Sequence, residues 1–247
     1  MLIPNQIYNG DCLKLMEEIP DESINLIITD LPYGLTNCKK NTWDKIIDPK
    51  LTWQQFKRIT KHNGTIALTG LGLFSALMIY EAQDIYKYSL IWKKNKPRGF
   101  LNAKIRPMSI HEDIIIFSKG KQTYNPQKTK GHKPVNSYTK NTSDGNNYGD
   151  TKKGFSGGGS TERYPVSVIE IPVVNNDSDQ KIHPTQKPVA LGEYLIKTYS
   201  NEGDLILDCA FGSGSFLVAA KKTNRKYIGI EIDSEMVKRT QERLNAI

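Results

Sequence analysis

The sequence predicts an open α/β sheet. Strand-like and helix-like patterns alternate through the first half of the chain, and a strand, a glycine loop, a helix and a second strand follow one another near its end, as in a βαβ unit. Two turns, at residues 29–34 and 208–215, each place an acidic residue directly after an apolar run. Ligands bind at that edge of open α/β sheets, so we expect both turns to line a site. The 247 residues suffice for one domain with an insertion.

The first half of the chain alternates between the two kinds of element. We expect strands at residues 24–29, 65–69, 86–93 and 113–118 and helices at residues 51–62 and 73–82. The apolar face of the first helix is expected at Leu51, Phe56 and Ile59. Gly64 follows this helix as a typical stop signal.

The last third of the chain contains the predicted βαβ unit. We expect helices at residues 188–199, 216–223 and 234–244 and strands at residues 205–209 and 227–232. Pro188 suits the first turn of its helix, and Ser234 is expected to cap the last helix.

Residues 119–165 differ in character from the rest. They hold nine of the Lys and Arg residues against three Asp or Glu, whereas the whole chain has a net charge of +8. Aliphatic residues are rare in this segment, and residues 156–160 form a Gly/Ser tract typical of a flexible segment. This basic, aromatic-dotted insertion either binds a polyphosphate partner or is a solvated loop kept soluble by lysine.

Several classes of protein are disfavoured. Residues 66–80 form the most apolar run, which polar residues interrupt and which is shorter than the ~20 residues of a membrane span, and the N-terminus lacks the pattern of a secretory signal. Three scattered cysteines favour a reducing cytoplasm. No CxxC or HxxxH pair is present, so we expect no metal site.

The glycine turn predicts a nucleoside-binding site. Gly212 and Gly214 let the backbone approach a ligand and turn into a helix, whose N-terminus presents free N–H groups. Glu231 ends the next predicted strand, 19 residues after Gly212, where a carboxylate can accept hydrogen bonds from ribose hydroxyls. Leu217 stands where a dinucleotide motif has its third glycine, which favours a nucleoside cofactor without phosphates, such as S-adenosylmethionine. Alone, the Gly-x-Gly pattern is equally typical of an ordinary turn, but Asp208 before it and Glu231 after it favour the cofactor site.

The turn Asp30-Leu31-Pro32-Tyr33 suits chemistry on an aromatic amine. The amino group of a base is a poor nucleophile because its lone pair is delocalised into the ring. The Asp30 carboxylate and the Leu31 carbonyl can accept its two hydrogens and so free that lone pair. Pro32 fixes the backbone and donates no N–H, while Tyr33 offers a flat face for stacking. An ordinary turn would explain the proline but not the acid beside the ring.

Together these motifs resemble the exocyclic-amino DNA methyltransferases, which methylate adenine N6 or cytosine N4. Residues 30–33 resemble the family motif D-P-P-Y, with Leu31 as a departure, and Asp rather than Ser at its first position favours adenine. Phe211, Gly212 and Gly214 match the F-x-G-x-G cofactor motif. By the same resemblance, Thr185 and Lys187 of His183-Pro184-Thr185-Gln186-Lys187-Pro188 should lie near the methionine carboxylate, and Asp11 of Asn9-Gly10-Asp11-Cys12 should meet the cofactor adenine.

The order of the motifs resembles the permuted β class of this family. It implies the Rossmann-like, S-adenosylmethionine-dependent methyltransferase fold, with a circularly permuted, seven-stranded, mostly parallel sheet and helices on both faces. It also implies a catalytic half at residues 1–118, a basic target-recognition insertion at 119–167 and a cofactor-binding half at 168–247.

The resemblance implies a site-specific enzyme that transfers a methyl group from S-adenosylmethionine to N6 of a flipped adenine in double-stranded DNA. Such an enzyme would be cytoplasmic, with no membrane partner, and relatives of this class are often homodimers. Methylation of cytosine N4, methylation of RNA or of a protein glutamine, and an inactive DNA-binding relative are the alternatives. The candidate site residues are as follows: catalytic Asp30, Leu31, Pro32 and Tyr33, and cofactor-binding Asp11, Thr185, Lys187, Asp208, Phe211, Gly212, Gly214 and Glu231.

Residues near the middle of the chain allow two interpretations. Lys93, Lys94, Lys96 and Arg98 either hold the DNA backbone or form a solvated strand end. Trp43 and Phe100 either wall the target pocket or belong to the core, and we expect Trp43 to be core.

Overall fold

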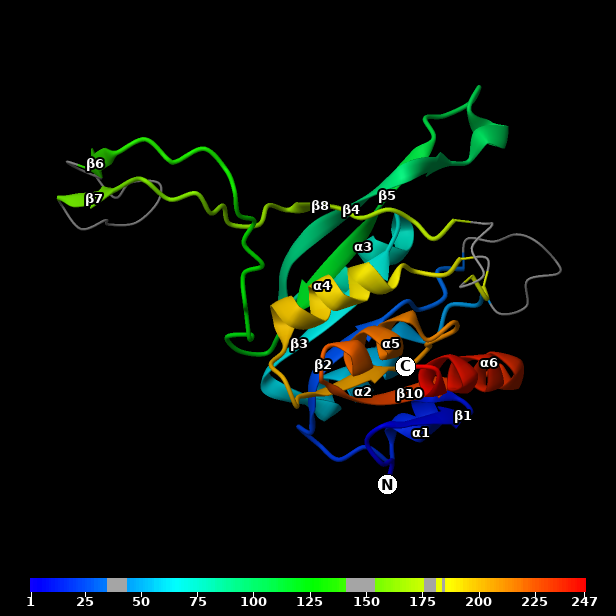
Figure 1. The fold of residues 1–247 in the computed structure, drawn as a ribbon. Helices are drawn as coiled ribbons and strands as arrows, with labels where there is room; N and C mark the ends of the chain where they lie inside the picture. The colour runs from blue at the N-terminus through cyan, green and yellow to red at the C-terminus, as the bar shows by residue number, and fades with distance from the viewer. Residues whose placement is uncertain (35–43, 141–153, 176–180, 184) are drawn as a thin grey trace. The chain divides into compact units, whose positions relative to one another are not determined.

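The computed structural model describes residues 1–34, 44–140, 154–175, 181–183 and 185–247. The chain forms two compact units, one of Met1–Asn125 with Ser167–Ile247 and one of Pro126–Val166 (Figure 1). The smaller unit lies inside the range 119–167 that the sequence suggested for an insertion. Trp43 lies outside the described residues, so its environment is not tested.

An eight-stranded sheet forms the centre of the larger unit, in the order β1-β10-β9-β2-β3-β5-β4-β8. Its strands are β1 (Gln6–Asn9), β2 (Ile24–Thr29), β3 (Thr60–Gly70), β4 (Tyr86–Arg98), β5 (Ser109–Phe117), β8 (Val168–Glu170), β9 (Leu205–Asp208) and β10 (Lys226–Glu231). Only β5 runs antiparallel to its neighbours β3 and β4, and every other pair is parallel. The predicted mostly parallel α/β sheet is confirmed.

The strand count differs from the seven expected. The additional strand is the short β8, which pairs with β4 at the edge of the sheet through Ile91↔Val168, Trp92↔Ile169 and Lys93↔Glu170. Only Ile169 of β8 is buried, so its apolar signal is too short to be recognised in the sequence.

Helices cover both faces of this sheet, as expected for a doubly wound fold. Helices α1 (Cys12–Met16), α2 (Pro49–Ile59) and α3 (Leu73–Glu81) pack on one face, and α4 (Val189–Tyr199), α5 (Ser215–Lys222) and α6 (Ser234–Asn245) pack on the other. The two apolar layers meet the sheet through alternate residues of β2: Ile27 belongs to the first layer, and its neighbours Leu26 and Ile28 belong to the second.

Two predicted boundaries are wrong. Helix α2 ends at Ile59, and Thr60 already has extended backbone, so the predicted stop at Gly64 lies inside β3. The buried side of α2 includes Trp53, whereas Leu51 is 49% exposed. The cap of α6 is Asp233, whose carboxylate accepts from two backbone amides, rather than Ser234.

The smaller unit is built from extended segments. Strands β6 (Tyr138–Lys140) and β7 (Phe155–Gly157) form an antiparallel pair, and Thr129 and Arg163 form an isolated antiparallel bridge. Within this unit the ammonium of Lys128 contacts both Glu162 and the ring of Tyr164. Because β7 ends at Gly157, the first two residues of the Gly/Ser tract at residues 156–160 belong to a strand.

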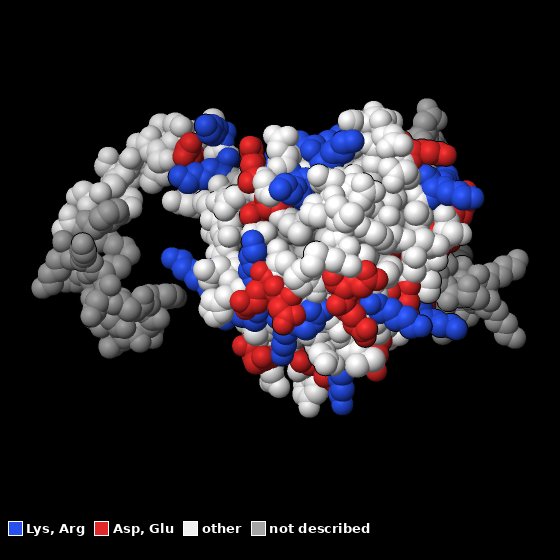
Figure 2. All heavy atoms as spheres, turned by 90° about the horizontal axis from the view of Figure 1, so that it is seen from below, with Lys and Arg blue, Asp and Glu red and all other residues white. Residues whose placement is uncertain are grey.

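Charge is mixed on the face of the molecule shown in Figure 2, where acidic and basic side chains lie side by side. Ion pairs of the larger unit include Lys57–Asp84, at 2.8 Å, and Arg58–Asp21, at 2.6 Å, and the acid of each pair is exposed. Among the described helices, none combines the length and the apolar character that crossing a membrane requires.

Candidate active site

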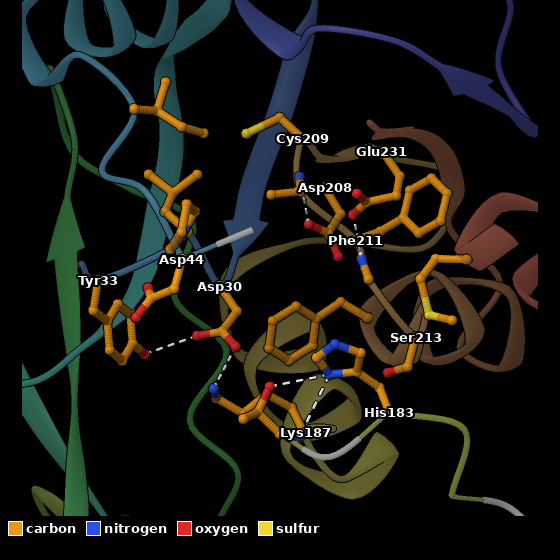
Figure 3. A pocket seen from close by; sticks show the side chains of 18 of the residues that line it. Asp30, Tyr33, Asp44, His183, Lys187, Asp208, Cys209, Phe211, Ser213 and Glu231 are labelled. Carbon is orange, nitrogen blue, oxygen red and sulfur yellow. Dashed lines mark hydrogen bonds and ion pairs between the residues drawn. The ribbon is translucent and has the colours of Figure 1, made fainter. Parts of the chain in front are cut away.

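The carboxyl ends of three neighbouring parallel strands bring the two predicted turns together. Register pairs Leu26 with Ile206 and Ile27 with Leu207, so β2 and β9 lie side by side although they are far apart in sequence. Asp30 follows β2, Asp208 ends β9 and Glu231 ends β10. All three carboxylates line one cavity of about 680 Å³ (Figure 3). This volume is within the ~300–1,000 Å³ of typical small-molecule sites.

The glycine loop lines one part of this cavity. The Gly212 amide donates to Glu231 Oε2 over 2.8 Å, and the Asp233 amide donates to Glu231 Oε1 over 2.9 Å. These bonds fix the carboxylate while leaving lone pairs on both oxygens. Gly212 has a left-handed φ of 48°, and a Cβ built there would meet no atom within 4 Å. The loop therefore leaves open space above its backbone, bordered by Phe211.

Gly214 is the predicted cofactor residue that does not line the cavity. It precedes α5 with a φ of 68°, and a Cβ there would overlap Cγ2 of Thr240 on α6. The structure thus gives this glycine a packing role between two helices. Leu217, in place of the third glycine of a dinucleotide motif, is fully buried in the core.

The remaining predicted cofactor residues border the same cavity. Asp11 caps α1 by accepting from the amides of Leu13 and Lys14 through Oδ1. Asp208 is 1% exposed, and burial raises the pKa of its carboxyl to about 8, reinforced by the nearby charges of Asp30 and Glu231. Burial thus favours the protonated form of Asp208.

The turn at residues 30–33 faces the cavity across from the glycine loop, and Leu31 and Pro32 line the cavity with it. The Tyr33 hydroxyl donates to Asp30 Oδ1 over 2.7 Å, and the Thr69 hydroxyl at the end of β3 donates to the same oxygen. The Tyr33 ring packs on Phe74, with 4.8 Å between centroids and an interplanar angle of 31°. Burial and the charges of Asp30 and Glu112 raise the pKa of Tyr33, so its phenol stays protonated.

Lys187 contacts the Asp30 carboxylate. Its ammonium donates to Asp30 Oδ2, which Figure 3 shows as a dashed line, and lies 3.3 Å from Glu112 Oε2. Burial of Asp30 favours its neutral form, but the charge and hydrogen bond of Lys187 outweigh that effect and lower the pKa of Asp30. Asp30 is therefore a carboxylate at neutral pH. That Lys187 also meets a cofactor carboxylate stays a prediction.

The segment before α4 adds His183 and Thr185 to the lining of the cavity. The Thr185 amide donates to His183 Nδ1 over 3.3 Å, and the Thr185 hydroxyl lies 3.0 Å from the same nitrogen. Burial lowers the pKa of His183, which favours the neutral imidazole.

Sequence reasoning missed two residues of the site. Thr69 is the last residue but one of β3, the strand next to β2, and that position near the carboxyl edge was a usable signal. Glu112 comes from the antiparallel β5, and nothing local in the sequence links it to Lys187.

The basic cluster at residues 93–98 divides into buried and exposed members. Lys94 is 6% exposed and donates to Glu112, so it does not form a solvated strand end. Lys93 pairs with Glu170 at 2.8 Å, and Lys96 donates to Asn175 over 2.9 Å. Arg98 lines the cavity. Phe100 is 80% exposed and does not line it, so the interpretation as a wall of the pocket is wrong.

Known proteins with similar structures share this fold. The PvuII DNA methyltransferase, described as cytosine-N4-specific, matches with a TM-score of 0.66 and 18% identity over 96% of this chain and 85% of that one. A structure described as the M1.HpyAVI-SAM complex matches with a TM-score of 0.63 and 23% identity over 97% of this chain and 99% of that one. At these identities the likeness concerns the fold.

Sequence comparison extends over nearly the whole chain. Type II methyltransferase M.HpaI of Haemophilus parainfluenzae is 29% identical over 253 residues, which cover 96% of this chain and 73% of the relative. Type II methyltransferase M2.MboI of Moraxella bovis is 27% identical over 264 residues, covering 98% of this chain and 88% of the relative. A family model described as DNA methylase matches residues 24–242. The resemblance read from the motifs is confirmed, and the chain belongs to the family of N6 and N4 DNA methylases.

Proposed function

We propose that this protein transfers a methyl group from S-adenosylmethionine to N6 of an adenine in double-stranded DNA. One observation carries the proposal: the turn at Asp30–Tyr33 and the glycine loop held by Glu231 line the same cavity. A donor seated on the loop and a base seated on the turn would be neighbours, and alignment of two reactants supplies a large part of a transfer rate.

The residues beside Gly212 fit a nucleoside cofactor. The open space at Gly212 admits a ligand against the backbone, and the free lone pairs of Glu231 suit the two hydroxyls of a ribose. When bound, S-adenosylmethionine supplies an electrophilic methyl group. Phe211, Gly212 and Glu231 would hold its nucleoside part, with Asp11 at the border of the cavity.

Asp30 is the proposed acceptor for the target amine. Among the described residues, two hydroxyl groups donate to its Oδ1, whereas Lys187 alone donates to Oδ2. A lone pair on Oδ2 therefore remains for an amino hydrogen, and the Leu31 carbonyl is proposed to accept the other. As the amine attacks, positive charge develops on its nitrogen, and the fixed Asp30 carboxylate stabilises that charge.

Tyr33 is proposed to stack on the target base. The ring is held from behind by Phe74 and at its hydroxyl by Asp30, so its orientation is set before a base arrives. An aromatic face accepts any base, so amine activation by Asp30, rather than stacking, must distinguish the target atom. A base in a duplex reaches such a pocket only by leaving the stack.

The hairpin between β4 and β5 is the proposed DNA contact next to the cavity. Residues 93–111 include six Lys or Arg and no Asp or Glu. Because β4 runs parallel to β2 and β3, the tip of the hairpin extends from the edge of the sheet that carries the site (Figure 1). At that tip, Leu101 is 95% and Ile105 82% exposed, so apolar and cationic groups are both presented there. Cations neutralise phosphates, and apolar side chains can pack against bases.

Adenine is favoured over cytosine because residue 30 is Asp. In the family, Ser at that position accompanies many cytosine N4 enzymes, and a carboxylate is the stronger acceptor of the two. The fold does not distinguish the two targets, since the PvuII relative is described as cytosine-N4-specific.

Product analysis tests the proposal directly. Unmethylated double-stranded DNA would be incubated with the protein and methyl-labelled S-adenosylmethionine, then digested to nucleosides and analysed by mass spectrometry. We expect labelled N6-methyladenine. Labelled N4-methylcytosine would refute the adenine assignment, and label in RNA or protein but not in DNA would refute the substrate class.

A further inference from the structure

Four charged side chains form a continuous row that leads from the catalytic turn into the sheet. Asp30 accepts from Lys187, Lys187 lies 3.3 Å from Glu112 Oε2, and Glu112 Oε1 accepts from Lys94. The four come from different places in the chain: the end of β2, the segment before α4, β5 and β4. All four line the cavity.

The inner members of this row are withdrawn from solvent. The side chains of Lys94, Lys187 and Glu112 are 6%, 9% and 13% exposed. Glu112 Oε2 is buried and receives no hydrogen bond from any described residue, although it lies near the Lys187 ammonium. Removing charges from water is costly, and an apolar core would do as well for stability. A buried row of alternating charges that ends on the proposed catalytic carboxylate therefore points to a role in the reaction.

Glu112 is the only described acid that contacts both ammonium groups of the row. Its Oε2 lies 3.3 Å from the Lys187 ammonium, and its Oε1 accepts from Lys94. Lys187 can therefore donate to Asp30 Oδ2 from a fixed position. The second lone pair of that oxygen then remains for the target amine. The orientation of the Asp30 carboxylate thus depends on an acid that does not touch it.

We infer that Glu112 is a positioning residue for methyl transfer, acting through Lys187 to hold the Asp30 carboxylate in the orientation that accepts the target amine. This inference rests on the proposed function. Glu112 itself would contact neither the base nor the cofactor, and Lys94 keeps its carboxylate in place.

The inference makes a specific prediction about pH. The charged and titratable groups around Lys187 are Asp30, Glu112, Tyr33, Lys94 and His183. Burial opposes the charged form of Lys187, but Asp30 and Glu112 outweigh it and raise its pKa. Removing the charge of Glu112 removes one of these two supports. Lys187 then loses its proton at a lower pH, so the alkaline limb of the rate profile shifts to lower pH.

The test is Glu112→Gln, which keeps the shape of the side chain and removes its charge. We expect kcat to fall by about 10- to 100-fold because a small misplacement of a reacting group has effects of that size. We also expect the alkaline limb of kcat to move to lower pH, because Lys187 loses one of the two charges that raise its pKa. The Kd of S-adenosylmethionine should stay unchanged. Asp84→Asn is the matched control, because it removes an acid from an ion pair, with Lys57, that lies outside the cavity, and it should alter none of these quantities.

Glu112→Asp provides the second variant. It retains the charge on a shorter side chain, so its rate should fall while its alkaline limb stays at the position of the unmodified protein. The inference is overturned if Glu112→Gln keeps the unmodified kcat, or loses rate with an unshifted pH profile. If Glu112→Gln does not fold, the inference is tested by Glu112→Asp alone. It is then overturned if the alkaline limb of Glu112→Asp shifts to lower pH. Absence of any methylated nucleoside with the unmodified protein would refute the proposed function itself, which is a separate outcome.

Discussion

Asp208 shows how the position of a single residue determines its ionisation. It ends β9 in the centre of the sheet, is 1% exposed, and has two other carboxylates near it, so its pKa rises to about 8. An unfolded chain would ionise this group near its ordinary value of 3.8. Between these two values the unfolded state holds less of the proton than the folded state, so the folded state loses stability as the pH rises.

Asp208→Asn should remove this pH dependence. Below pH 4 the carboxyl is neutral in both the folded and the unfolded state and does not affect the free energy of unfolding. Above pH 8 it is ionised in both states, and the full cost of burying the charge destabilises the folded state. Relative to the unmodified protein, the variant should gain on the order of 3–5 kcal/mol of unfolding free energy between pH 4 and pH 8. Denaturant unfolding at several pH values measures this difference. Parallel stability curves for the two proteins would show that the environment of Asp208 has been misjudged.

At the scale of the element, the turn before α5 depends on close contact with α6. Gly214 has a left-handed φ of 68°, and a side chain there would overlap Thr240. Gly203 has a φ of 81° but open space around the position of a Cβ. Comparing a substitution at Gly214 with the same substitution at Gly203 therefore distinguishes the effect of steric overlap from that of backbone strain.

Gly214→Ala should destabilise the protein by about 1–3 kcal/mol more than Gly203→Ala, because only the first adds a clash to the strain of the left-handed conformation. Adding Thr240→Ser, which removes the methyl group and keeps the hydroxyl that donates to the Gly212 carbonyl, should recover part of the loss. Urea unfolding of the three variants measures these terms. Equal losses for the two glycine variants would contradict the packing role.

The hairpin beyond β4 is the second element with a testable role. Lys104→Gln combined with Arg106→Gln should weaken DNA binding and reduce the slope of log Kobs against log salt concentration by up to about 2, since each lost phosphate contact contributes about 0.9. Lys87→Gln with Lys226→Gln is the matched control, because both lysines lie at the amino-terminal ends of their strands, at the edge of the sheet opposite the site. A salt slope that changes equally in both double variants would argue against a phosphate-binding hairpin.

Elements with a strong local signal could be predicted from the sequence. The strand predicted at residues 24–29 has those bounds in the structure, because a run of Ile and Leu between polar turns is a signal that tertiary contacts reinforce. The end of α2 was mistaken because His62-Asn63-Gly64 looks like a helix stop, whereas Thr60 pairs with Ile24 and so begins a strand. The link between Glu112 and Lys187 could not be predicted, since it depends on how β5 is inserted between β3 and β4.

At the scale of the whole molecule, the two compact units are expected to have different tasks. The larger one contains the sheet, both apolar layers and the cavity, whereas the described part of the smaller one consists of extended segments with little apolar burial. The smaller unit therefore contributes little to the hydrophobic core, and we propose that it binds DNA.

Replacing residues 126–166 by a flexible Gly/Ser linker should leave the thermal transition of the larger unit and its affinity for S-adenosylmethionine nearly unchanged, because both apolar layers lie outside the replaced segment. DNA affinity should fall strongly and lose much of its salt dependence. Calorimetry and fluorescence anisotropy measure the two properties. Retention of the original salt-dependent DNA affinity would assign DNA binding to the larger unit alone.

The central claim is that Asp30 activates the target amine while other residues hold the cofactor, and Asp30→Ala tests it most directly. In this variant Lys187 still has Glu112 as a partner, so the fold should persist. We predict that single-turnover methyl transfer to DNA falls at least about 100-fold, as expected when a fixed group that stabilises developing charge is removed, while the Kd of S-adenosylmethionine stays unchanged. Transfer at the unmodified rate, or loss of cofactor binding by a folded variant, would contradict the account.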